Sequence, residues 1–334
     1  MLIDLLGLAL ATAVTLMAAI PIRWIALRYG VLDHPGSHKT HQDPIPYLGG
    51  LAIWLGLVVS VAVIAPEQKR IAALLTVILL LGLGDDIFGA KVATKLVVEL
   101  AVAVSVVGLG FVWHITDSYF LNVGISLLWI VAVTNAFNLL DNMDGLTSTV
   151  AIAGLLGIAL LSRDIAYFAL PMAGALLGFL YWNRPPARMF MGDAGSLMVG
   201  FSLAVATIST ANSSFGLHSV ALLVGPVAVA VFDTSLVVVS RILANLPIQV
   251  GGRDHFSHRL QTMGWSRPKV LVAAFLAAIL GDAIALLASS YPHFEAWLAV
   301  PIAVSGASVW LWLLRMNPYS AKIELVEARA VTGA

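Results

Sequence analysis

The sequence predicts an all-α polytopic integral membrane protein with about 11 transmembrane helices. Hydrophobic residues make up 60% of its 334 residues and charged residues only 11%, whereas a soluble domain is about one quarter charged. The apolar stretches are long and continuous, unlike the alternating strands of a transmembrane β-barrel. These observations exclude a soluble globular enzyme, a coiled coil and a disordered chain.

The apolar stretches have the length that a membrane-spanning helix requires, about 20 residues. In chain order the predicted spans are 2–22, 47–65, 70–84, 95–113, 121–138, 145–161, 165–182, 190–210, 217–245, 269–288 and 293–315. The ninth contains Gly225-Pro226, which predicts a kink or a break. The first is interpreted as a span and not a signal peptide, because no small-residue cleavage site follows it. The spans leave room for one domain only, residues 1–334.

The distribution of basic residues predicts how the spans are oriented. Of the 18 Lys and Arg residues, all but Lys69, Arg70 and Arg163 fall on one side of the predicted spans. Loops rich in Lys and Arg face the cytoplasm. The N-terminus is therefore expected outside and the C-terminus in the cytoplasm.

The polar residues gather in five segments on the predicted cytoplasmic side: 30–50, 84–95, 135–146, 183–196 and 246–267. Five of their carboxylates stand at span ends: Asp85, Asp86, Asp141, Asp144 and Asp193. Carboxylates crowded at a membrane boundary require a cation or a basic partner. The chain has no cysteine, so oxygen ligands and a hard ion, Mg²⁺ or Mn²⁺, are indicated. The Lys, Arg and His residues of these segments suit a phosphorylated substrate, and the zero net charge does not indicate nucleic acid.

The spacing of these residues predicts further details. Asp141 and Asp144 are three positions apart, so they share a face if the helix continues through them. Phe190 precedes Asp193 by three residues, which places a ring suited to stacking on a base near a carboxylate. Asp233 lies inside the ninth span, and an intramembrane acid indicates a functional site by default.

Each of these residues also has a simpler interpretation. Asp193 could cap the eighth helix, and Asp141 and Asp144 could be carboxylates favoured at a helix start. Phe190 could contact lipid or neighbouring helices, and Lys39 could be a basic residue that only sets the orientation.

Together the five segments resemble the polyprenyl-phosphate N-acetylhexosamine-1-phosphate transferase superfamily, glycosyltransferase family 4. The matching motifs are Pro44-Ile45-Pro46 with Gly49-Gly50, Gly84-Asp85-Asp86, Asn138 to Gly145, Phe190 to Ser196, and Asp254 to Leu260. The resemblance implies that a polyprenyl (undecaprenyl) phosphate attacks the β-phosphorus of a UDP-N-acetylsugar, giving polyprenyl-diphospho-sugar and UMP. It also implies a requirement for Mg²⁺, or Mn²⁺, and a multi-pass location in a bacterial plasma membrane with the site facing the cytoplasm.

The resemblance assigns roles to residues at matching positions. Asp85 and Asp86 are implied as catalytic, Asp85 at the lipid phosphate and Asp86 beside the metal and diphosphate, with Asp193 as the metal ligand. The residues implied in substrate binding are Lys39, Asn138, Asp141, Asp144, Asn183, Phe190, Asp233, His255 and His258. A homodimer is a further expectation.

Three departures from the family pattern bear on the sugar. Asn142 stands where relatives often have Gly, His38 stands where many have Arg, and the histidine motif is Asp254-His255-Phe256-Ser257-His258. The phospho-N-acetylmuramoyl-pentapeptide transferase branch of the family carries a run of three histidines, which this sequence lacks. This difference argues against that branch and favours UDP-GlcNAc as the donor. That branch, a proton-coupled secondary transporter and a non-catalytic scaffold are the alternatives. Transporters commonly place their site at the midplane between repeats, and no repeat is visible here.

Overall fold

The computed structural model describes residues 2–34, 43–212, 217–248, 252–291 and 295–316. Its helices are α1 (Leu2–Tyr29), α2 (Gly49–Ile64), α3 (Lys69–Phe88), α4 (Val92–Gly108), α5 (Tyr119–Leu140), α6 (Leu146–Leu161), α7 (Arg163–Asn183), α8 (Gly192–Ala211), α9 (Leu217–Val224), α10 (Ala228–Leu243), α11 (Phe256–Thr262), α12 (Arg267–Ser290) and α13 (Glu295–Arg315). Two 3₁₀ turns, Pro66–Gln68 and Gly225–Val227, complete the helical elements. Strands β1 (Leu32–Asp33) and β2 (Ile45–Pro46) form a two-residue antiparallel ribbon.

The prediction of an all-α polytopic membrane protein is confirmed. Within the described ranges, seven helical segments are long and apolar enough to cross a membrane, and α2 and α6 are shorter apolar helices. Every predicted span coincides with a helix, and the expected break in the ninth span is the 3₁₀ turn Gly225–Val227 between α9 and α10. Pro226 causes it, because a proline ring clashes with the preceding turn and has no N–H to donate.

One predicted boundary was wrong in a way that matters for the site. The third span was expected to end at residue 84, but α3 continues to Phe88. The next residue, Gly89, has a φ of 72° and stops the helix. Asp85 and Asp86 therefore lie in the last turn of a helix rather than in a loop, and the helix fixes the directions of their side chains.

Helix α8 forms the centre of the bundle, and its residues from Ala194 to Ile208 are nearly all buried. It packs against α2, α3, α5, α6 and α7. Two glycines permit this approach: a Cβ atom on Gly50 would lie 2.4 Å from the backbone nitrogen of Gly195, and one on Gly82 would lie 2.3 Å from the Cα of Ala194. Small residues at such contacts let helices pack closely in membranes. The start of α8 is thereby held between α2 and α3.

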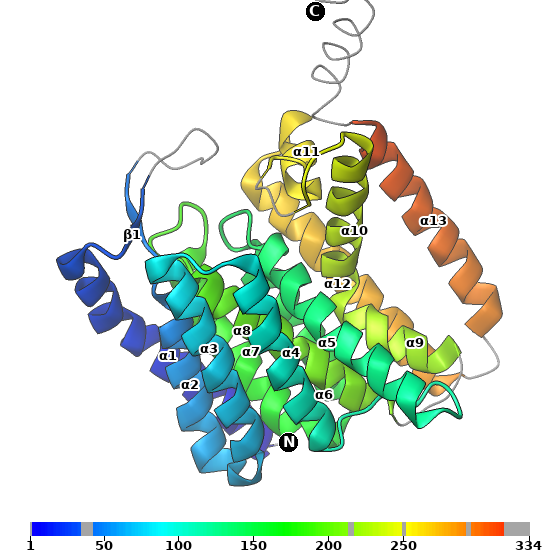
Figure 1. Cartoon of the computed structure of the whole chain (residues 1–334), viewed down its shortest axis with the longest axis horizontal. Coiled ribbons are helices and arrows are strands. Elements are labelled where there is room, and N and C mark those ends of the chain that lie inside the picture. The colour runs from blue at the N-terminus through cyan, green and yellow to red at the C-terminus, as the bar shows by residue number, and fades with distance from the viewer. Residues whose placement is uncertain (1, 35–42, 213–216, 249–251, 292–294, 317–334) are drawn as a thin grey trace, which may run out of the picture.

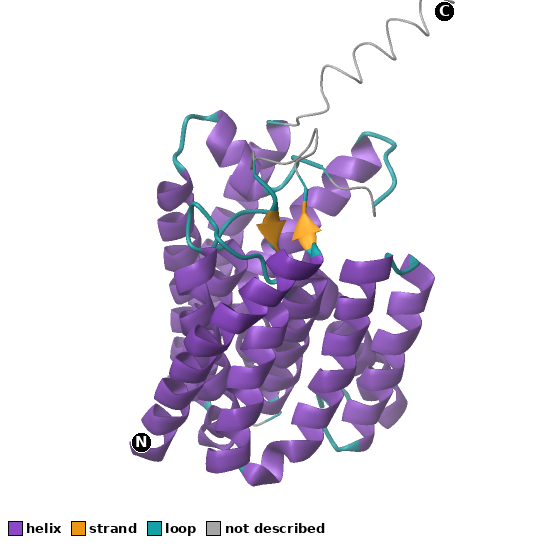
Figure 2. Cartoon of the chain, turned by 90° about the vertical axis from the view of Figure 1, so that its left-hand side faces the viewer, coloured by secondary structure: helices purple, strands orange, loops and turns teal. Residues whose placement is uncertain are grey.

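The polar segments meet at one end of the bundle. In Figure 1, β1, α11 and the connecting loops lie at the upper end, and α1 begins at the opposite end. Figure 2 shows the β1–β2 ribbon standing above the same end of the helices. Helix α13 lies at the edge of the bundle and packs against α10.

Candidate active site

A cavity of about 600 Å³ opens at this end of the bundle. It draws its walls from all five predicted polar segments, and its lining residues are Leu32, Asp33, His34, Tyr47, Asp86, Asn138, Asp141, Asn142, Met143, Asp144, Asn183, Phe190, Gly192, Asp193 and His258. Eight residues predicted for the site are among them. Asp85, Asp233 and His255 are not, and Lys39 lies outside the described residues.

The first wall of the cavity is the junction between the end of α3 and the start of α8. The carboxylate of Asp86 accepts hydrogen bonds from the backbone N–H groups of Asp193 at 2.8 Å and Ala194 at 3.1 Å. These are N–H groups that the first turn of a helix cannot satisfy internally. Gly192 makes the contact possible, because a Cβ atom there would lie 2.4 Å from Asp86 Oδ2. Asp193 therefore does not cap α8; Asp86 does, which leaves the Asp193 carboxylate available for other contacts.

Lys95 bridges the carboxylates of Asp85 and Asp193. Its Nζ lies 2.6 Å from Asp85 Oδ2 and 2.7 Å from Asp193 Oδ2. Asn138 donates to the other oxygen of Asp193 at 3.0 Å. The ammonium group offsets the repulsion of two neighbouring carboxylates. Lys95 was not among the predicted site residues, although its position in the same segment as Asp85 was the signal for such a role.

The wall that carries Asp141 and Asp144 is a turn. Helix α5 ends at Leu140, and the next helix begins only after Gly145, which has a φ of 76°. The helix does not continue through both residues, so the condition under which the two aspartates would share a helix face is not met. Asn183 holds this turn, because its Oδ1 accepts from the backbone N–H of Gly145 at 2.9 Å and its Nδ2 donates to the Met189 carbonyl at 3.0 Å.

Asp144 is held from two directions. Its Oδ2 accepts from the backbone N–H of Ala187 at 3.2 Å and from the Arg267 guanidinium, at the start of α12, at 2.9 Å. Asp141 lacks such an ion pair among the described residues. Burial raises its pKa to about 7, and the negative charges of Asp193 and Asp144 contribute.

The chemistry of the donors fits a hard divalent cation. Asp86, Asp141 and Asp193 all line the cavity with carboxylates, and the negative charges of Asp193 and Asp144 add to the effect of burial in raising the pKa of Asp141. Within the described ranges no group of three or more His, Asp or Glu side chains can hold a metal ion by itself. These residues suit Mg²⁺, which commonly binds one or two carboxylates and takes its other ligands from phosphate and water.

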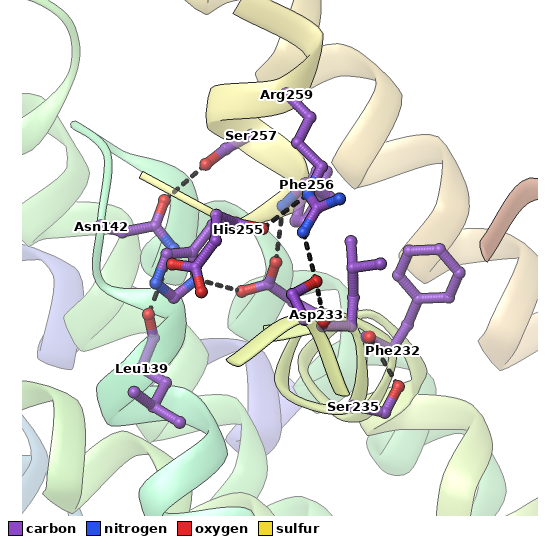
Figure 3. A network of polar contacts seen from close by, with 12 residues as sticks. Leu139, Asn142, Phe232, Asp233, Ser235, His255, Phe256, Ser257 and Arg259 are labelled. Carbon is purple, nitrogen blue, oxygen red and sulfur yellow. Dashed lines mark hydrogen bonds and ion pairs between the residues drawn. The ribbon is translucent and has the colours of Figure 1, made fainter. Parts of the chain in front are cut away.

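The histidine segment is anchored to α10 by buried polar contacts (Figure 3). Asp233 is fully buried; its two carboxylate oxygens contact His255 Nδ1 at 2.7 Å and accept from the Phe256 backbone N–H at 2.8 Å. Arg241 pairs with Asp254 through two contacts, at 2.8 and 3.0 Å. Asp233 and His255 thus attach the start of α11 to α10, and neither of them lines the cavity.

His258 projects from α11 into the cavity. Burial lowers its pKa to about 4, and the positive charges of His255 and Arg253 add to the effect. The ring is therefore neutral near pH 7 in the absence of a ligand, and it can donate or accept one hydrogen bond.

The fold and the cavity define a multi-pass membrane protein with a carboxylate-rich polar site at one end of its helices. The profile of glycosyl transferase family 4 matches residues 70–211. A probable undecaprenyl-phosphate N-acetylglucosaminyl 1-phosphate transferase of Bacillus subtilis is 32% identical over 301 residues, which cover 84% of each chain. The decaprenyl-phosphate N-acetylglucosaminephosphotransferase of Mycobacterium tuberculosis is 30% identical over 81% of this chain and 79% of its own.

A third relative is more distant. The undecaprenyl-phosphate alpha-N-acetylglucosaminyl 1-phosphate transferase of Escherichia coli K12 is 25% identical over 87% of this chain and 84% of its own. The chain belongs to glycosyl transferase family 4 and is a membrane transferase.

Proposed function

We propose that this protein transfers N-acetylglucosamine 1-phosphate from UDP-N-acetylglucosamine to a polyprenyl phosphate, with release of UMP. The observation that carries the proposal is the cavity itself, which places five carboxylates, three asparagines, two histidines and two aromatic rings around one space at the end of the membrane helices. The names of the relatives support the same donor sugar and a polyprenyl phosphate acceptor. This would be the first membrane step of cell-envelope polysaccharide synthesis.

In this reaction an oxygen of the polyprenyl phosphate attacks the β-phosphorus of the donor. The bond between that phosphorus and the oxygen bridging to the α-phosphate breaks, and UMP leaves with the bonding electron pair. Phosphoryl transfer depends mainly on positioning and on charge stabilisation. Lys95, fixed between Asp85 and Asp193, would offset negative charge at the diphosphate, and Asp85 would orient the acceptor phosphate.

The remaining cavity residues would bind the donor. Phe190 would stack on uracil and Asp144 would recognise it, while Asn138 and Asp141 would line the sugar part of the pocket. His258 would contact the diphosphate or sugar, with Asp233 and His255 as its support. Lys39 and Asn183 would lie near the nucleotide.

We further propose that Mg²⁺, with Mn²⁺ as a substitute, is the cofactor. Asp193 would hold it, because its carboxylate lines the cavity and is not used to cap α8. The ion would neutralise the donor diphosphate when bound.

The proposed topology has eleven spans, with the N-terminus outside a bacterial plasma membrane and the cavity facing the cytoplasm. This topology is supported by the concentration of Lys and Arg residues on one side of the predicted spans, since loops rich in these residues face the cytoplasm. The chain has no cysteine, so single cysteines introduced at the exposed residues Lys91 and Asp117 would be labelled from opposite sides by an impermeant thiol reagent. Labelling of both from the same side would contradict the topology. A homodimer stays a prediction.

The decisive experiment incubates purified protein with undecaprenyl phosphate, Mg²⁺ and a panel of UDP-sugars, and measures UMP. Release with UDP-GlcNAc that requires both lipid and metal is the expected result. Release with UDP-N-acetylmuramoyl-pentapeptide alone would establish the alternative branch. If folded protein released no UMP with any donor, the proposal would be overturned. The transporter and scaffold alternatives would then be favoured.

A further inference from the structure

Three consecutive residues of the turn after α5 are each bonded to the segment around α11. Asn142 Oδ1 accepts from Ser257 Oγ at 2.5 Å, Met143 Sδ accepts from Gln261 Nε2 at 3.4 Å, and Asp144 pairs with Arg267 at 2.9 Å. We refer to these three contacts as the strap. It joins segments that are more than 100 residues apart in the chain.

The strap connects two walls of the cavity. Its turn side consists of Asn142, Met143 and Asp144, all of which line the cavity. On the other side, Ser257 directly precedes His258, which also lines the cavity. The distance between the Asp141–Asp144 turn and the His258 ring therefore depends on these contacts.

Both halves of the strap are also held by contacts elsewhere in the fold. The α11 side is anchored to α10, because the buried Asp233 binds His255 and the Phe256 N–H, and Arg259 donates to Asp254 and Ser240. Figure 3 shows the contact between Asp233 and His255 beside the Asn142–Ser257 hydrogen bond.

On the turn side, Asn142 uses both ends of its amide. Its Nδ2 donates to the Leu139 carbonyl in the last turn of α5 at 3.1 Å, and its Oδ1 accepts from Ser257. This one side chain thus connects the end of α5 with α11.

We propose that Asn142 and Ser257 are positioning residues, which hold His258 at a fixed distance from the Asp141–Asp144 turn and thereby set the affinity for the nucleotide-sugar donor. The inference rests on the proposed function and deepens it. When the strap is absent, the donor must order the two walls itself, and that ordering weakens binding. Once bound, the donor restores the geometry, so turnover changes less than affinity does.

The test is a double-mutant cycle with N142A, S257A and N142A/S257A. Loss of one hydrogen bond between uncharged groups predicts a KM for UDP-GlcNAc that rises about three- to tenfold in each single variant. The double variant should be no worse than either single one, because both remove the same contact. The value of kcat should change by less than about twofold. S257T keeps a hydroxyl that can donate to Asn142 and should retain an affinity close to that of the wild type.

The matched control is S289A, which removes a hydroxyl that bonds only within α12, at the end remote from Arg267; its KM should equal that of the wild type. Donor binding is also titrated by calorimetry with UDP-GlcNAc and no lipid, which gives a readout besides turnover. If S257A does not fold, Q261A tests the second contact of the strap.

The outcomes separate the two proposals. If the wild-type protein neither binds nor turns over any UDP-sugar, the proposed function is overturned. Active wild-type protein whose N142A and S257A variants keep the wild-type KM, or whose effects add in the double variant, overturns the strap.

Discussion

The carboxylate of Asp86 accepts the backbone N–H of Asp193 at 2.8 Å, so the last turn of α3 caps the first turn of α8. The Tyr47 hydroxyl donates to the backbone carbonyl of Asp86 at 2.7 Å and holds the same junction from the segment before α2. Three elements remote in sequence therefore meet at one aspartate. The position of Asp193 in the cavity depends on this junction.

We predict that D86A both destabilises the protein and abolishes UMP release. Two N–H groups at the start of α8 would lose their acceptor, at a cost of about 1–3 kcal/mol. D86N keeps one acceptor oxygen and should lose less stability. The measurements are the thermal unfolding midpoint in detergent and the rate of UMP release. Equal midpoints for D86A and the wild type would contradict the capping role.

Lys95 is expected to be essential for turnover. K95Q removes the charge between Asp85 and Asp193, and loss of such an oriented charge costs roughly 10²–10³-fold in kcat. The matched control is K91Q, since Lys91 lies at the start of the same helix and is exposed. K91Q should retain wild-type kcat. Comparable activity of K95Q and K91Q would show that the bridge is not used in the reaction.

The sequence predicted the segments that form the site better than it predicted the contacts inside them. All five polar segments contribute to the cavity, because the membrane restricts polar groups to the span ends. The bridge from Lys95 to Asp193 and the strap from Asn142 to Ser257 depend on how helices pack against one another, which no local pattern specifies.

The three-residue spacing of Asp141 and Asp144 places them on one helix face only if the helix continues, and it does not. Helix α5 ends at Leu140, and Gly145 adopts a positive φ. Asp233 is a second case. Its place inside a span predicted a functional site, whereas in the structure its carboxylate contacts His255 and does not line the cavity.

Removal of divalent metal should abolish UMP release, and Mg²⁺ or Mn²⁺ should restore it. D193N should weaken Mn²⁺ binding as followed by electron paramagnetic resonance, even without lipid acceptor, because Asp193 is the proposed ligand. D164N is the control, since Asp164 lies in the first turn of α7, at the end opposite Asn183, which lines the cavity. Unchanged Mn²⁺ binding by D193N would contradict this assignment.

His258 should make stability depend on pH between about 4 and 6.5. Its pKa is lowered to about 4 in the folded protein, whereas an unfolded histidine titrates near 6.5. The unfolded chain therefore binds more protons in this window, so the free energy of unfolding falls as the pH decreases through it. The full effect is on the order of 1–3 kcal/mol. H258Q should show a flatter dependence of the unfolding midpoint on pH than the wild type. Parallel curves for the two proteins would mean that His258 is protonated at its ordinary pKa in the fold.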